Sequence, residues 1–148
     1  MSAPACFLEG IVSDRFIDIT SENIDSEHLC CIIRTKKPHP GVETKRAWLR
    51  DRLGEGHVFR KLDEKACIEY APLESAWVPI VGDNYIYIYC LWVLSENKGK
   101  GYGRRLMESC IADAKAQCKS GVCMLGAKKQ KAWLSDQSFA KKFGFETV

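Results

Sequence analysis

The sequence lacks the features that would place this protein in a membrane or on a secretory route. No apolar run reaches the ~18 residues that a membrane-spanning helix needs. The first ten residues, MSAPACFLEG, lack the basic segment and the apolar stretch of a secretion signal. These absences predict a cytoplasmic location and no association with a membrane.

Motifs for metals and for two common nucleotide folds are also missing. The eight cysteines include no C-x-x-C pair, and the three histidines, His28, His39 and His57, are scattered without metal-ligand spacing. The glycine-rich segment lies late in the chain with the spacing G-x-G-x-G and is not followed by a Lys-Ser or Lys-Thr pair. The sequence therefore predicts no metal site, and a Rossmann or Walker phosphate loop fits poorly.

Disulfides are not expected despite the even number of cysteines. A chain of 148 residues can bury about two-thirds of its unfolded surface and needs no covalent staples. Cys67, Cys90 and Cys123 each lie within an apolar, strand-like run. We predict that most of these thiols are small buried hydrophobic groups, and nothing in the sequence activates one as a nucleophile.

Length predicts one domain, and charge divides that domain into two parts. Residues 1–97 carry 11 basic and 15 acidic side chains, whereas residues 98–148 carry 11 basic and 4 acidic ones. This asymmetry predicts an anionic ligand or a nucleic acid near the C-terminal part. The alternative is a solvated, lysine-rich helix face that binds nothing.

The hydrophobic pattern predicts an α/β fold. Strands are expected at 16–20, 57–62, 65–71, 85–93 and 122–125, and helices at 27–33, 42–53, 101–119 and 133–143, with a loop over 36–41. The run Tyr85–Val93 is apolar on both faces and predicts a central, covered strand. Strict alternation would place Tyr85, Tyr87, Tyr89, Leu91 and Val93 on one face, and Ile86, Ile88, Cys90 and Trp92 on the other.

The segment Lys98–Arg104 (KGKGYGR) follows the central strand and opens a helix. Glycines let a ligand approach the backbone closely, and the free N–H groups of a helix start attract anions. Lys98, Lys100, Arg104 and Arg105 add positive charge. The segment therefore predicts an anion-binding site.

The run Val93–Leu106 resembles motif A of the GNAT superfamily of acyl-CoA-dependent N-acetyltransferases. That motif reads Gln or Arg, two residues, Gly, one residue, then Gly or Ala; Gly101 and Gly103 match it, and Lys98 takes the first place. Residues 138–145 (SFAKKFGF) are similar to the family's FYxKxGF element. The segments HPG, IEYAP and KGKGYG look most like the YoaP-like subgroup. The resemblance covers residues 14–148.

The resemblance implies a GNAT fold, of the α/β (α+β) class. Its central sheet is mixed and mostly antiparallel, with helices on both faces and a V-shaped splay between the central strand and the next one. Residues 1–148 would form a single acetyltransferase domain. Because the family normally adds one more strand after the position of GFETV, the resemblance also implies either a truncated chain or an edge completed by another chain.

The same resemblance implies acetyl-CoA as cosubstrate, with no metal. Its pyrophosphate would contact the N–H groups of the glycine loop, and its pantetheine arm would pair with the backbone of the central strand. The cofactor-binding residues expected are Leu91, Val93, Lys98, Gly99, Lys100, Gly101, Tyr102, Gly103 and Arg104. For the charged side chains in this set, solvated charge remains the alternative.

The catalytic positions depart from the family pattern. Tyr87 occupies the place of the glutamate that many members carry on the central strand, Phe139 the place of their acidic tyrosine, and Trp133 the place of an asparagine. Tyr87 and Tyr89, with Tyr85 beside them, and Glu69 acting through water are therefore the catalytic candidates. The alternatives are tyrosines of an amphipathic core and an exposed glutamate on a strand.

The resemblance implies an N-acetyltransferase acting on a small-molecule or peptide amine by direct attack in a ternary complex, as a monomer or homodimer. The alternative is a non-catalytic acyl-CoA-binding domain, because of Tyr87 and Phe139. A nucleic-acid binder is disfavoured, because Trp133, Phe143 and Phe145 are expected to be buried. Carboxylates at 22, 25 and 27 indicate either a cationic acceptor or a complement to a helix dipole.

Overall fold

The computed structural model describes residues 15–29, 37–129, 131 and 134–148. The strands are β1 (Phe16–Asp18), β2 (Val58–Leu62), β3 (Ala66–Pro72), β4 (Tyr85–Val93), β5 (Gly121–Met124), β6 (Gly126–Ala127) and β7 (Ser135–Asp136). The helices are α1 (Pro40–Leu53), α2 (Tyr102–Ala116) and α3 (Gln137–Lys141), with single 3₁₀ turns at Leu73–Ser75 and Ser95–Asn97. In this part of the chain, no helix combines the length and the apolar character needed to span a bilayer.

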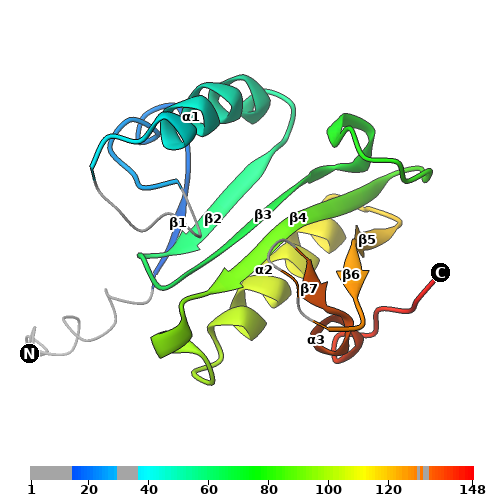
Figure 1. Ribbon diagram of the computed structural model, residues 1–148. Helices are drawn as coiled ribbons and strands as arrows, with labels where there is room; N and C mark the ends of the chain where they lie inside the picture. Colours follow the sequence, from blue (N-terminus) through cyan, green and yellow to red (C-terminus); the bar gives the residue numbers. More distant parts are fainter. Residues whose placement is uncertain (1–14, 30–36, 130, 132–133) are drawn as a thin grey trace, which may run out of the picture.

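One five-stranded sheet, in the order β1-β2-β3-β4-β5, forms the centre of the molecule (Figure 1). Strands β1 to β4 are antiparallel neighbours, and β5 runs parallel to β4. Strands β6 and β7 form a separate parallel pair. The predicted α/β class and the mixed, mostly antiparallel sheet are confirmed.

Helices cover both faces of this sheet, with α1 and α2 on opposite sides (Figure 1). Helix α2 buries an apolar stripe that includes Leu106 and Cys110 against Ile68, Ile86 and Ile88. On the other face, Leu49 of α1 belongs to a second cluster with Ile19, Ile24, Leu29, Phe59 and Cys67. The i, i+4 spacing of Leu106, Cys110 and Ala114 placed this stripe correctly.

Helix α1 begins two residues earlier than its pattern predicted, inside the expected 36–41 loop. The Nδ1 atom of His39 accepts a hydrogen bond of 3.0 Å from the backbone N–H of Gly41. Pro40 occupies the first helical turn, where the N–H that proline lacks would have no intrahelical partner. An imidazole cap and a first-turn proline together start the helix at a point that periodicity alone does not mark.

Two other helix predictions need correction. Residues 21–26 form hydrogen-bonded turns, and most of the helix expected at 27–33 lies outside the described residues. The helix expected at 133–143 is only Gln137–Lys141, because Asp136 caps it by accepting a hydrogen bond of 2.7 Å from the Ser138 N–H. Ser135 and Asp136 pair with β6 instead, and Trp133 lies outside the described residues.

Strand β4 contains one extra residue, which changes the predicted faces. Glu69 pairs with Cys90 but its neighbour Tyr70 pairs with Ile88, so Tyr89 is a β-bulge. Beyond the bulge the two faces exchange: Leu91 and Val93 pack with Ile86 and Ile88 on the α2 side. The prediction that Leu91 and Val93 share a face with the tyrosines, and Cys90 the opposite face, is wrong.

Strands β4 and β5 separate after their first four residue pairs. The parallel pairing joins Tyr85–Ile88 to Gly121–Met124 and stops there, while β4 continues to Val93. Beyond β5 the chain enters the small β6–β7 sheet rather than following β4. The V-shaped splay is thus present. Beyond Ile88 the β5-facing edge of β4 pairs with no strand among the described residues, while the other edge of β4 stays paired with β3.

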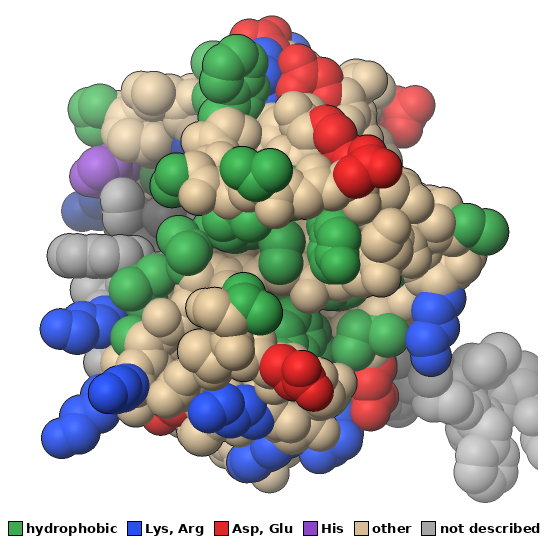
Figure 2. All heavy atoms as spheres, turned by 90° about the vertical axis from the view of Figure 1, so that its right-hand side faces the viewer, with side chains coloured by type: hydrophobic (Ala, Val, Ile, Leu, Met, Phe, Trp, Pro, Cys, Tyr) green, Lys and Arg blue, Asp and Glu red, His purple; other side chains and the backbone are tan. Residues whose placement is uncertain are grey.

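The outer edge of β5 also pairs with no other strand in the part of the chain that the structure describes. A groove of about 770 Å³ runs along it, and its apolar lining includes Ile111, Val122 and Phe145. Figure 2 shows hydrophobic side chains gathered in the hollow of this face. Residues 145–148 form no strand.

Substitution of Leu106 measures how much the α2 face of the core contributes to the free energy of unfolding. Its side chain is fully buried, so Leu106→Ala should lower the free energy of unfolding by about 2–5 kcal/mol through a lost apolar contact and a residual cavity. Lys115→Ala, an exposed position on the same helix, should change it by less than about 0.5 kcal/mol. Urea denaturation of both variants measures the difference, and equal effects would contradict this view of the core.

Candidate active site

A groove of about 620 Å³ lies where β4, the glycine loop, the start of α2 and α3 meet. Its lining residues are Leu91, Val93, Asn97, Lys98, Gly99, Gly101, Tyr102, Gly103, Arg104, Ser135, Asp136, Phe139 and Lys142. All the residues predicted to bind the cofactor are in this set except Lys100, which is exposed outside it. The structure therefore brings together residues whose role was inferred only from a motif.

The glycine loop has a backbone conformation that requires glycine. Gly99 and Gly101 have φ values of +79° and +81°, in the left-handed region that other residues rarely adopt. Gly101 caps α2 without a side chain, and the first turn of α2 carries no acidic residue. The N–H groups of that turn are therefore available to an anion, at the positive end of the helix dipole.

The start of α2 packs against β4 and α3 at Gly103, where a Cβ would make ordinary van der Waals contacts. A Cβ atom at this position would lie 3.4 Å from the ring of Phe139 and 3.5 Å from the side chains of Leu91 and Val93. This contact depends on the bulge in β4, because the bulge turns the side chains of Leu91 and Val93 towards α2. The floor of the groove is thus apolar and its upper rim is a row of backbone amides.

Several cations surround the groove, but each is solvated. Lys98, Arg104 and Lys142 are exposed. The Arg104 guanidinium lies 5.2 Å from the centre of the Phe143 ring and 3.6 Å from the Glu108 carboxylate. These side chains can add to an anion's binding by long-range attraction, while the fixed backbone amides define where it lies.

Four residues of the groove were not singled out from the sequence: Asn97, Ser135, Asp136 and Lys142. The Asp136 carboxylate accepts hydrogen bonds from Ser138, which lower its pKa. Asn97 ends the 3₁₀ turn that follows β4. No periodicity marks these positions, since they meet only when α3 folds against the start of α2.

The three predicted catalytic residues form a second cluster, on the α1 side of the sheet. The rings of Tyr87 and Tyr89 are 4.9 Å apart, and Tyr89 lies 5.2 Å from the ring of His57. Nε2 of His57 is 2.8 Å from Oε1 of Glu69. His57 therefore lies between Glu69 and Tyr89, and Tyr87 packs against Tyr89. The sequence pattern gave His57 no role in a site.

Glu69 is not the exposed strand residue of the alternative prediction, since its exposed fraction is 6%. The Lys45 ammonium, from α1, donates to both of its carboxylate oxygens at 2.6 Å. Burial raises the pKa of Glu69, but the hydrogen bonds from His57 and the charge of Lys45 outweigh it, so the pKa falls below its ordinary value. Glu69 is therefore a buried, ionised carboxylate.

The two tyrosines differ in what their hydroxyl groups contact. The Tyr89 hydroxyl donates to the Ala76 carbonyl at 2.9 Å, and burial together with the nearby Glu69 charge raises its pKa to about 12. Burial also raises the pKa of Tyr87, whose hydroxyl has no hydrogen-bond partner among the described residues. Both hydroxyl groups are neutral near pH 7. Unlike the Tyr89 hydroxyl, the Tyr87 hydroxyl donates no hydrogen bond to a described carbonyl.

The carboxylates that could attract a cationic acceptor form ion pairs or hydrogen bonds with other side chains of this protein. Asp25 pairs with Arg50 at 2.5 Å, and Glu27 pairs with Lys61 at 2.5 Å. The Glu22 carboxylate accepts a hydrogen bond of 3.1 Å from Thr20. These contacts favour a structural role for the acidic segment.

The described cysteines are free thiols. Burial raises the pKa of Cys110 to about 12 and also raises that of Cys123. Such thiols are protonated at neutral pH and are poor nucleophiles. Within the described ranges, no three His, Cys, Asp or Glu side chains are grouped so as to hold a metal ion.

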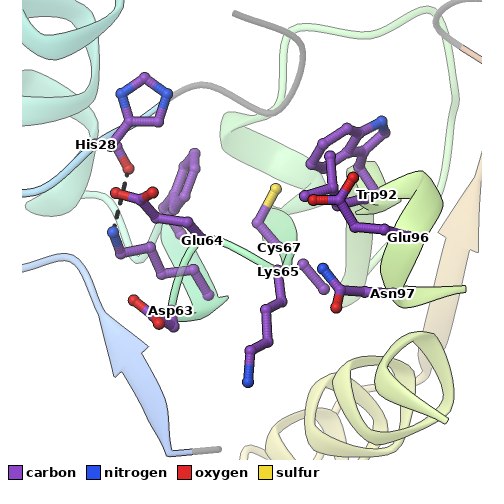
Figure 3. A pocket seen from close by; sticks show the side chains of 12 residues that line it. His28, Asp63, Glu64, Lys65, Cys67, Trp92, Glu96 and Asn97 are labelled. Atoms are coloured by element: carbon purple, nitrogen blue, oxygen red, sulfur yellow. Dashed lines mark hydrogen bonds between the residues drawn. The ribbon is translucent and has the colours of Figure 1, made fainter. Parts of the chain in front are cut away.

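Another cavity, of about 460 Å³, lies beside the turn between β2 and β3. Figure 3 shows Cys67 and Trp92 on its wall, with charged side chains such as Glu64, Lys65 and Glu96 around them. It contains none of the predicted catalytic residues. Asn97 lines both this cavity and the groove at the glycine loop.

Comparison with known proteins connects these features to one family. Residues 21–145 match the model of the acetyltransferase (GNAT) family. Over 132 residues, 88% of the chain, the sequence is 44% identical to the uncharacterized N-acetyltransferase YoaP of Bacillus subtilis, and it spans 53% of that relative's length. The chain thus corresponds to about half of this relative.

Solved acetyltransferase structures share the fold. A putative acetyltransferase from Agrobacterium tumefaciens superposes with a TM-score of 0.63 at 18% identity, covering 90% of this chain and 94% of that one. AAC(6')-Iy in complex with the bisubstrate analog CoA-S-monomethyl-acetylneamine gives a TM-score of 0.63 at 10% identity, with 90% of both chains covered. At these identities the likeness concerns the fold alone.

The buried carboxylate predicts a pH-dependent contribution to stability. Because the pKa of Glu69 is lower in the folded protein than the ordinary 4.5, its stabilisation is complete above pH 4.5 and is lost as the pH falls through the folded-state pKa. Glu69→Gln should therefore lower the free energy of unfolding by about 1–3 kcal/mol at pH 7. The gap to the wild type should narrow below pH 4.5 in denaturation series, and a constant gap would contradict the assignment.

Proposed function

The chain belongs to the acetyltransferase (GNAT) family, and on this premise we propose that it transfers an acetyl group from acetyl-CoA to a primary amine of a small molecule or peptide. The observation that carries the proposal is the groove at the splay. It joins the start of α2, which no side chain caps, to the part of β4 whose β5-facing edge is unpaired among the described residues. It so offers an anion site and an extended backbone in one continuous surface.

The groove has the chemistry that acetyl-CoA would need. Its pyrophosphate fits the N–H groups of residues 99–103, where glycines leave the backbone exposed and the helix dipole is positive. Lys98, Arg104 and Lys142 can neutralise further phosphate charge from the rim. The pantetheine arm can add to the free edge of β4 near Leu91 and Val93, as an extended peptide adds to a sheet.

This orientation directs the thioester towards the bulge. An arm that follows β4 from Val93 back to Leu91 arrives at Tyr89, where β4 and β5 meet. Tyr87 lies one pair inside that junction, opposite Cys123. The acceptor would then approach from the α1 side, where Tyr87 packs against Tyr89 and Tyr89 lies close to Glu69.

The reaction we propose is a direct attack in a ternary complex. Glu69 accepts a proton from the acceptor ammonium through a water molecule, and the freed amine attacks the acetyl carbonyl carbon. The new N–C bond forms as the C–S bond breaks, and the departing thiolate takes a proton from the Tyr87 hydroxyl. The resulting tyrosinate takes the second proton from the acetylated nitrogen, so that CoA thiol, a neutral amide and protonated Glu69 remain, and Glu69 releases its proton to solvent. Tyr89, whose own proton is held by Ala76, shapes the site beside Tyr87.

A thermal-shift assay tests cofactor binding. Acetyl-CoA at about 100 times its Kd should stabilise the wild type by roughly 2.7 kcal/mol and raise its Tm. Gly103→Val should weaken binding at least tenfold, because the added methyls fill the groove between Phe139, Leu91 and Val93. Gly54→Ala, at a position with open space around it, should bind as the wild type does. A wild type that shows no shift would refute both the cofactor and the reaction.

Steady-state release of CoA over a panel of amines tests the proton donor. Tyr87→Phe should lower kcat by about 10²-fold while leaving the KM for acetyl-CoA unchanged, since only the hydroxyl is removed. Tyr85→Phe is the matched control on the same strand. Full activity of Tyr87→Phe would rule out this donor.

The same panel separates the proposed enzyme from a non-catalytic acyl-CoA-binding domain. Phe139, which lies in the groove, carries no proton donor and is the observation that favours this second function. Binding of acetyl-CoA without CoA release over amines, amino acids, polyamines and peptides would establish the non-catalytic alternative.

A further inference from the structure

Glu69 is held by two residues that come from outside its own strand. Lys45 extends from α1 and reaches both carboxylate oxygens at 2.6 Å. His57 precedes β2 and contacts Oε1 at 2.8 Å, and its side chain is 2% exposed. Because an ionised carboxylate only accepts hydrogen bonds, the Nε2 atom of His57 must carry the proton of this contact.

Burial opposes the ionised form of a carboxylate at this depth. Burial alone can raise a glutamate pKa to about 8–9, and a protonated Glu69 would be unable to accept a proton from a substrate. The Lys45 charge opposes this effect directly. Lys45 is itself held in place, since its ammonium lies 5.0 Å from the ring centre of Trp48 and 5.7 Å from that of Phe59.

We infer that Lys45 is a positioning residue for acetyl transfer: it keeps the Glu69 carboxylate ionised and, together with His57, orients that carboxylate towards the tyrosine-lined side of β4. This inference rests on the proposed function, in which Glu69 accepts the acceptor's proton. Lys45 acts through Glu69 and contacts neither of the two substrates in this scheme.

The described side chains donate three hydrogen bonds to the Glu69 carboxylate. A carboxylate has about four lone-pair directions, and the described contacts use three of them: Oε1 accepts from Lys45 and His57, and Oε2 accepts from Lys45. The remaining position belongs to Oε2. A water molecule bound there would link Glu69 to an amine, as the proposed reaction requires.

The charged and titratable groups around Glu69 come from three elements. Lys45 faces it from α1, His57 from the start of β2, and Tyr89 from β4. The pKa of Tyr89 is in turn lowered by Arg52, in the last turn of α1, and raised by Glu55, just after that helix. Lys45 is a cation in direct contact with both oxygens, and its charge and its hydrogen bond act beside the hydrogen bond from His57 to lower the pKa of Glu69. Removing the Lys45 charge should therefore raise the proton affinity of Glu69.

The pH dependence of kcat/KM tests the inference. In Lys45→Met the Glu69 pKa rises, so the acid limb of the profile should move to higher pH by about 1–3 units. Lys45→Arg, which restores a cation, should return the limb most of the way to its wild-type position. Arg50→Met is the matched control, because it removes a cation of the same helix that pairs with Asp25; its acid limb should stay in place.

Carbon-13 NMR of selectively labelled glutamate carboxyls provides a readout that does not depend on turnover, with Glu69→Gln to assign the signal. The Glu69 midpoint should rise in Lys45→Met and not in Arg50→Met. An unchanged midpoint would overturn the inference, as would a shifted midpoint with an unmoved acid limb. A wild type that binds no acetyl-CoA would instead refute the proposed function, whatever the NMR titration shows.

Discussion

The single extra residue at Tyr89 determines which side chains meet in this protein. Before it, β4 alternates regularly, with Ile86 and Ile88 towards α2 and Tyr87 towards α1. After it, Leu91 and Val93 turn to the α2 side and close against Gly103. A regular strand would point these two side chains away from the glycine loop, and the groove would lose its apolar floor.

The bulge also coincides with the place where β4 and β5 part. Pairing with β5 ends at Ile88, one residue before the bulge. A bulge increases local twist and frees backbone groups from the ladder, so the separation of the strands and the change of faces have a common location. The bulge therefore lies between two features on opposite faces of the sheet. One is the groove, and the other is the Tyr87–Tyr89–His57–Glu69 cluster.

The sequence predicted the central strand, the glycine loop and the α2 stripe, because each depends on neighbours along the chain. The bulge was not predictable in this way, since nothing in YIYIYCLWV marks where one residue must be skipped; only the register against Glu69 and Tyr70 shows it. Glu69 was selected as a candidate, but its partners Lys45 and His57 are 24 and 12 residues away. Their meeting depends on how α1 crosses the sheet, which periodicity does not specify.

The basic side chains of the C-terminal third do not define the position of a bound anion. Lys100 is exposed and does not line the groove. Arg104 is solvated and pairs with Glu108, and Lys98 and Lys142 are exposed at the groove. Exposed charges of this kind are screened by salt and hold no fixed position. The backbone holds the N–H groups of the glycine loop in fixed positions. They therefore define where an anion binds. The basic side chains then act mainly by drawing a phosphate-rich ligand towards that place.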